Sequence, residues 1–288
     1  MVLRYRSVAG SFCGALFDMT NIVLTGWVFY PSVLIGFAWW TVTYVLATGP
    51  FRIRHNWGGT PTLLQRVAFH AGTLVGLIAL VSPLDKLGDE YLFSAHMIQH
   101  LLLMFVTAPL WLVGTPGWLI DLIIPVRLRK FVGWFTRSGT AFAVFVSVMT
   151  IWHVPALYTL ALHNDGVHIF EHLIFIGAAL IGWWPVLAAD NSFASPLPPP
   201  ARLLYLFLLA IPMTALAAIL TFSSAPLYAF YVQAPHIFGL GVMDDQRLGG
   251  LLMWLPTHMV LLLIASITFQ KWFIEEERQA KALYLHSQ

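Results

Sequence analysis

HMIQHLLLM, residues 96–104, is the segment from which both the fold and the site are predicted, and HNDGVHIFEH, residues 163–172, is its counterpart. Each contains an HxxxH pair close to the start of a hydrophobic run. Residues four apart lie on one face of an α-helix, one turn apart, so each pair can direct two imidazoles toward one point. With His153 between them, these segments hold six of the chain's eleven histidines. Such a concentration indicates a shared metal site rather than an inert apolar core.

The composition is that of an integral membrane protein. The chain has 288 residues, of which 59% are hydrophobic and only 10% are charged, with a mean hydropathy of +0.77. Soluble globular proteins have about 25% charged residues. The formal charge of +2 gives no indication of a nucleic-acid partner. A single cysteine, Cys13, excludes an internal disulfide framework, and a lone cysteine is more often a small apolar filler than a ligand.

The hydrophobic runs predict an all-α protein, a bundle of seven transmembrane helices. Each run is long enough to cross a ~30 Å hydrocarbon layer as a helix of ~20 residues. A further apolar piece near 118–125 is too short to span and is expected to form an interfacial helix. The seven predicted spans cover residues 31–49, 62–84, 92–113, 139–162, 167–189, 202–222 and 248–270.

The predicted spans divide the chain into three parts. An apolar stretch over residues 8–29 resembles a signal peptide, but Asp18 and Asn21 interrupt it and no cleavage site is clear. It is therefore expected to lie at the membrane surface, with an additional span as the alternative. The predicted parts are an N-terminal interfacial or periplasmic segment, 1–30, a seven-helix membrane domain, 31–270, and a cytoplasmic tail, 271–288.

The basic residues predict the orientation. Eleven of the fifteen Lys and Arg residues fall on one side of the predicted membrane domain. Cytoplasmic loops carry an excess of Lys and Arg, so this side is expected to face the cytoplasm. The predicted protein is thus a multi-pass membrane protein, with its N-terminus on the outer side and a cytoplasmic C-terminus.

This topology places the six histidines in the outer half of the membrane. At 1.5 Å per residue, three of them lie ~8–13 Å below the outer surface, on three different predicted helices. The other three form a shallower layer. Ionisable residues inside a bilayer are costly and are most often functional. The deeper layer consists of His100, His153 and His172, and the shallower one of His96, His163 and His168.

Imidazole is a ligand for copper, zinc and iron, and nearby thioethers favour Cu(I). Met97 and Met104 are the auxiliary candidates beside the first histidine pair, although each alone is more often a packing residue. Glu171 precedes His172 and is a candidate acceptor that orients an imidazole. Asp245 opens the last predicted span, where it is expected to line an entrance, donate a ligand or cap the helix.

The same residues carry a family resemblance. HMIQHLLLM followed by Pro109, WHVPALY at 152–158, His168 with the Glu-His pair at 171–172, and DQRLGGLLMW at 245–254 are similar to motifs of the CtaG family. Its members are multi-span cytochrome c oxidase assembly factors associated with caa-type oxidases. The resemblance extends from about Trp27 onward. It implies a seven-span protein of the bacterial inner membrane that helps a haem–copper oxidase mature through its copper centre.

The resulting hypothesis is copper handling. Copper from the periplasm would be held as Cu(I) by the six histidines and passed to the catalytic subunits of the oxidase within the lipid membrane. A weak site with few ligands would permit exchange, unlike a closed four-ligand site. No nucleophile, phosphate loop or catalytic dyad is evident in the sequence, so a chaperone is expected rather than an enzyme. Whether a separate periplasmic donor brings the copper is left open.

Three alternatives remain at the level of sequence. Two histidines from different helices could ligate haem, which a Soret band would reveal. HxxxH pairs also occur in non-haem iron membrane enzymes, but those pairs usually come with more histidines and carboxylates on the cytoplasmic face. A purely structural scaffold for assembly would retain its function after His-to-Ala changes.

Overall fold

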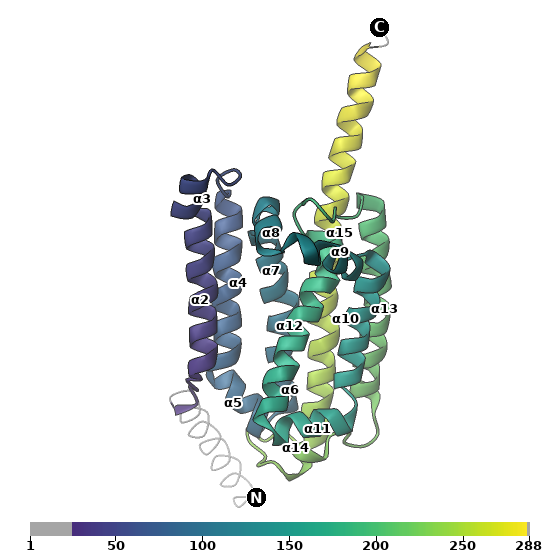
Figure 1. Cartoon of the computed structure of the whole chain (residues 1–288). Coiled ribbons are helices and arrows are strands. Elements are labelled where there is room, and N and C mark those ends of the chain that lie inside the picture. The colour runs from purple at the N-terminus through teal and green to yellow at the C-terminus, as the bar shows by residue number, and fades with distance from the viewer. Residues whose placement is uncertain (1–24, 287–288) are drawn as a thin grey trace, which may run out of the picture.

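A computed structural model describes residues 25–286, and these residues form a bundle of helices (Figure 1). Among them, six helices are long and apolar enough to cross a membrane, or up to seven if one bent pair counts as a span. The all-helical prediction is therefore confirmed. Most of the predicted segment 1–30 lies outside the described residues.

The six spans overlap six of the predicted hydrophobic runs, but the first and the last extend beyond the predicted ends at residues 49 and 270. They are Pro31–His55 (α2, Pro31–Thr48, and α3, Pro50–His55), α4 (Leu63–Val81), Phe93–Gly114 (α6, Phe93–Leu101; η1, Leu102–Thr107; α7, Ala108–Gly114), α12 (Asp165–Leu187), α13 (Pro199–Phe222) and α15 (Val242–His286).

The fourth predicted span, 139–162, is not one helix, and this part of the prediction is wrong. Helix α10 (Ser138–Trp152) ends one residue before His153, and α11 (Pro155–His163) begins after the break. A proline cannot donate a backbone hydrogen bond and disfavours helical geometry in the residue before it, so Pro155 ends the helix. Helix α11 then lies across the end of the bundle (Figure 1).

On its other side, α10 is preceded by α9 (Val126–Phe135), and the two are bent by 72°. This is the bent pair that would count as a seventh span. Before it, α8 (Gly117–Ile123) corresponds to the short helix predicted near 118–125. The basic segment between the third and fourth runs is thus mostly helical.

A second proline shapes the region before the site. The predicted span 62–84 ends early, because the hydroxyl of Ser82 accepts a hydrogen bond from the backbone N–H of Leu84 and Pro83 opens a new helix. This helix, α5 (Pro83–Glu90), leads directly into α6. It carries three acidic residues, Asp85, Asp89 and Glu90, to the same end of the bundle as α11 (Figure 1).

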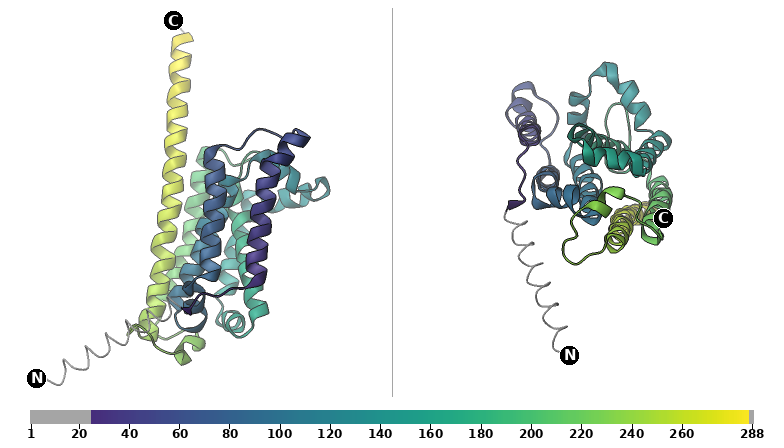
Figure 2. Two further views of the ribbon diagram at one scale, coloured as in Figure 1. Left: turned by 90° about the vertical axis from the view of Figure 1, so that its left-hand side faces the viewer. Right: turned by 90° about the horizontal axis from the view of Figure 1, so that it is seen from below.

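Helix α15 is 45 residues long and leaves the bundle. Figure 2 shows its last part projecting beyond all the other helices. The predicted tail from residue 271 onward therefore continues the last span as helix. A five-residue helix not foreseen from the sequence, α14 (Ala229–Gln233), lies at the opposite end, near α11.

The core lies among α6, α7, α10, α12, α13 and α15. Large aromatic side chains fill it, and Trp183, Phe145 and Phe175 are almost fully buried. The indole N–H of Trp183 donates to the backbone carbonyl of Met104 over 2.8 Å, inside the π-helical segment η1. π-Helical turns often accompany functional sites, and this one directly follows the first histidine pair.

Candidate metal centre

Two neighbouring helices bring both HxxxH pairs together. On α6 the ring centroids of His96 and His100 lie 4.1 Å apart, and on α12 those of His168 and His172 lie 4.3 Å apart. Across the helices, the ring centroids of His96 and His168 are 5.4 Å apart, as are those of His100 and His172. Four imidazoles thus form one cluster, as expected for residues one turn apart on facing helices.

A carboxylate joins this cluster. One potential ligand atom from each of His96, His100, His168 and Glu171 lies within 4.8 Å of the others. Glu171 and His96 are each only 1% exposed. Glu171, expected from the sequence to orient a histidine, is placed among the groups that could bind a metal directly. Imidazole suits copper, zinc and iron, and a carboxylate beside imidazoles is typical of zinc and non-haem iron sites.

The atoms of the cluster that could bind a metal have no hydrogen-bond partners in the described part of the chain. Both ring nitrogens of His96 and of His100, both carboxylate oxygens of Glu171, and Nε2 of His168 and His172 are buried without one. Buried polar atoms are nearly always paired, because an unpaired one costs about 1–3 kcal/mol. Several buried nitrogen and oxygen atoms without a partner at one point are what a site for a bound cation or ordered water requires.

His153 lies in the break between α10 and α11, beside the cluster. Its Nδ1 is 2.6 Å from the backbone carbonyl of Met149, which can only accept, so Nδ1 carries the proton. The lone pair is then on Nε2, which is buried and has no partner in the described chain. His153 is therefore available as a further ligand.

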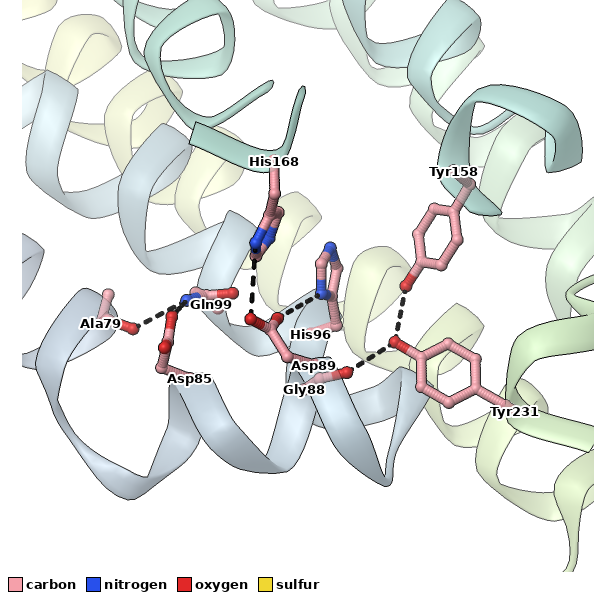
Figure 3. A network of polar contacts seen from close by, with 9 residues as sticks. All are labelled: Ala79, Asp85, Gly88, Asp89, His96, Gln99, Tyr158, His168 and Tyr231. Carbon is pink, nitrogen blue, oxygen red and sulfur yellow. Dashed lines mark hydrogen bonds and ion pairs between the residues drawn. The ribbon is translucent and has the colours of Figure 1, made fainter. Parts of the chain in front are cut away.

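Asp89 on α5 links the two histidine pairs. Its Oδ1 lies 3.6 Å from Nδ1 of His96, and its Oδ2 lies 3.4 Å from Nδ1 of His168 (Figure 3). A carboxylate in this position can orient imidazoles that use their other nitrogen for a metal. The sequence analysis missed Asp89. The only signal was its position seven residues before His96, on a segment too short to predict as a helix.

Asp85, one turn before Asp89, has a different environment. Its carboxylate accepts a 2.6 Å hydrogen bond from the side-chain amide of Gln99, which also donates to the carbonyl of Ala79 (Figure 3). Burial and, to a smaller extent, the neighbouring Asp89 raise the pKa of Asp85 to about 7. This network connects α5 to α6 at Gln99, which lies between His96 and His100 in the sequence.

Tyrosines support the opposite side of His96. The ring of Tyr158 packs 5.2 Å from the imidazole, and its hydroxyl lies 3.0 Å from that of Tyr231. The hydroxyl of Tyr231 donates to the carbonyl of Gly88 (Figure 3). A Cβ on Gly88 would lie 2.9 Å from the backbone nitrogen of His96, so only glycine allows α5 to approach α6 this closely.

Asp245 has a role in supporting the site. From α15, its carboxylate accepts hydrogen bonds from the backbone N–H groups of Phe93 (2.7 Å) and Ser94 (3.2 Å) and from the hydroxyl of Ser94. The residue before α6, Leu92, has no side chain that can cap the helix. Asp245 therefore caps α6, the helix that carries His96, rather than its own helix.

The remaining candidates are His163, Met97 and Met104. His163 is exposed at the end of α11, where its Nδ1 lies 2.7 Å from the carbonyl of Thr159. The break at Pro155 turns this residue away from the position expected for a continuous span. Met97 and Met104 are buried in the hydrophobic core, and their role as ligands remains a prediction.

These features describe an all-helical protein whose long apolar helices fit a membrane protein, with a buried group of imidazoles and a carboxylate between two of them. The chain belongs to the family described as cytochrome c oxidase caa3 assembly factor, whose model matches residues 42–275. The resemblance seen in the sequence is thereby confirmed. The description of the family is that of assembly factors for a cytochrome c oxidase of the caa3 type.

The similar curated proteins come from mycobacteria. Uncharacterized proteins of Mycobacterium bovis and Mycobacterium tuberculosis are each 25% identical over 277 residues, which cover 90% of this chain and 41% of theirs. One from Mycobacterium leprae is 24% identical over 234 residues, covering 72% of this chain and 34% of its own. The chain thus spans about two fifths of the length of these relatives or less. No solved structure matches it.

Proposed function

We propose that this protein holds copper on the histidine cluster between α6 and α12 and passes it to a cytochrome c oxidase during assembly. The proposal rests on a set of buried potential ligand atoms that have no hydrogen-bond partner. One such atom from each of four residues lies within 4.8 Å of the others: His96, His100, His168 and Glu171. The three imidazoles suit copper among other metals, and the family's role in oxidase assembly favours copper as the cargo.

The number of donors favours transfer over permanent storage. His172 adds a fifth group to these four, which is more than one ion needs in a four-coordinate site, and the unpaired Nε2 of His153 is a further candidate. An ion can then exchange between subsets of ligands without leaving the cluster. This property supports a chaperone rather than an enzyme.

Copper delivery requires the cluster to face the right side of the membrane. We propose seven spans, with α10 as the short one: its 15 residues give ~22 Å of helix, and α9 and α11 bend away at its ends. The more basic end, which carries α3 and α9, would face the cytoplasm. The cluster then lies in the periplasmic half, where copper arrives.

Haem is the main alternative cargo, and the packing of the rings disfavours it. The cross-helix imidazole pairs have centroids 5.4 Å apart, which is ordinary contact distance for two rings. A macrocycle could lie between them only if α6 and α12 separated.

Metal analysis of protein purified in mild detergent under reducing conditions tests the proposal. We expect near-stoichiometric copper without a Soret band, and its loss in the double variant His100→Ala/His168→Ala. His258→Ala is the matched control, because the ring of His258 is hydrogen-bonded to the hydroxyl of Thr214 and the backbone carbonyl of Trp254, away from the cluster. A Soret band would assign the site to haem. If the protein binds neither copper nor haem after reconstitution, a structural scaffold remains as its function.

A further inference from the structure

A cavity of about 500 Å³ lies against the histidine cluster, between α2 and α12. His168 and His172 belong both to its wall and to the cluster. Its rim is exposed at several residues of both helices, including Ser32 and Gly36 on α2 and Ile169 on α12. The cavity therefore connects the surface of the protein with imidazoles that otherwise lie deep in the bundle.

The polar residues of this cavity are gathered at one end. Three carboxylates, those of Asp85, Asp89 and Asp165, line it together with the two histidines. They come from α5 and from the first turn of α12, which lie at the same end of the bundle (Figure 1). Toward the other end the wall is aromatic and aliphatic, with Phe37, Trp40 and Trp111.

The charge of the polar end selects the kind of ligand that enters. No Lys or Arg is among the described residues that line the cavity. A cleft that carries charge of one sign with apolar walls concentrates ions of opposite sign and raises their rate of association. The lining thus favours a cation and disfavours a phosphate-bearing lipid headgroup.

We propose that this cavity is the path by which the copper cation enters and leaves the histidine cluster. The inference rests on the proposed function and adds the route that the copper cation takes to the cluster. The exposed Asp165 attracts the cation at the mouth, and Asp89 lies next along the path, 3.4 Å from Nδ1 of His168. The unpaired Nε2 of His168 then leads to the donors of His96, His100 and Glu171.

Blocking the path tests it without changing a ligand. Gly36 lines the cavity, and a Cβ on it would meet no atom within 4 Å, so Gly36→Trp can fill the space. Gly177→Trp is the control: a Cβ there also meets nothing within 4 Å, and Gly177 on α12 does not line the cavity.

The measurement is the rate of loading with Cu(I) supplied as its bicinchoninate complex, and the rate of loss to the chelator bathocuproine disulfonate. A blocked path slows both rates by the same factor and leaves the dissociation constant unchanged. We expect about a tenfold slowing in Gly36→Trp, equivalent to a barrier about 1.4 kcal/mol higher, and none in Gly177→Trp.

A second variant tests the charged mouth and does not depend on how Gly36→Trp folds. Asp165→Asn should slow loading about threefold at low ionic strength, and the difference should vanish in high salt. Glu90→Gln is its control, because Glu90 is an exposed acid on α5 outside the cavity.

The outcomes separate the path from the proposed function. If the wild-type protein binds no copper, the proposed function fails. If it binds copper and both Gly36→Trp and Asp165→Asn load at the wild-type rate, the cluster stands and the path is overturned. A changed dissociation constant with an unchanged loading rate would also overturn the path.

Discussion

Asp89 is the residue that couples the two halves of the site. Its two oxygens face Nδ1 of His96 on α6 and Nδ1 of His168 on α12. A carboxylate between imidazoles favours the tautomer in which Nε2 is free to bind a metal. Because Gly88 lets α5 approach the backbone of His96 so closely, this contact depends on tertiary packing. Spacing along the sequence could not have revealed it.

The neighbouring Asp85 makes a prediction about pH. Its pKa is about 7 in the folded protein and 3.8 for the ordinary group, so the folded state retains a proton that the unfolded state releases. Stability should therefore fall as the pH rises from about 4 to about 7, by at most about 4 kcal/mol, and then level off. Asp85→Asn is neutral throughout and should lack this part of the fall.

The apparent melting temperature of metal-free protein in detergent, measured across this pH range, checks the prediction. The difference between wild type and Asp85→Asn isolates one carboxyl group, because the other titrating groups are common to both proteins. Asp244→Asn, at an exposed acid, should follow the wild-type curve. Parallel curves for wild type and Asp85→Asn would contradict the raised pKa of Asp85.

At the scale of elements, the anchoring of α6 by α15 yields a further prediction. Asp245→Ala removes the acceptor for the backbone N–H groups of Phe93 and Ser94. Hydrogen bonds to a charged group contribute about 1.5–3 kcal/mol each, so we expect the loss of these two to cost about 3–6 kcal/mol. Copper affinity should fall as well, because α6 carries His96 and His100.

Unfolding by SDS in mixed micelles measures the first effect, and competition with a Cu(I) chelator measures the second. Asp244→Ala is the matched control one residue away: this acid is exposed, and its ion pair with Arg247 spans 3.6 Å at the surface. Such pairs contribute about 0–1 kcal/mol. Equal stability of the two variants would mean that Asp245 does not anchor α6.

The sequence was informative where its signal is periodic and local, and uninformative where packing decides. Hydropathy found six of the spans, although the first continues into α3 and the last continues along α15 well past the predicted end, and the HxxxH spacing found the four imidazoles of the cluster. The break after α10 was missed because hydropathy over 139–162 is continuous although Pro155 ends the helix. His163 was therefore expected at the wrong place, and Asp89 was not expected at all.

At the scale of the whole molecule, the charges and the site occupy opposite ends. The basic helices α3 and α9 lie at one end, beside the projecting part of α15, and the acidic helix α5 lies at the other (Figures 1 and 2). This separation is the reason for expecting the cluster to face the periplasm. It also places the acidic mouth of the cavity on the side from which copper would come.

Cysteine labelling tests this orientation directly. In a Cys13→Ser background, which removes the chain's single cysteine, Glu90→Cys should react with a membrane-impermeant maleimide in intact spheroplasts. Lys281→Cys, on the exposed end of α15, should react only after permeabilisation, and labelling of both variants in lysed cells is the control. Because α5 and the end of α15 lie at opposite ends of the bundle, the two results must be opposite if α15 crosses the membrane (Figure 2). The reverse pattern would place the cluster in the cytoplasmic half, and copper would then have to come from a cytoplasmic donor.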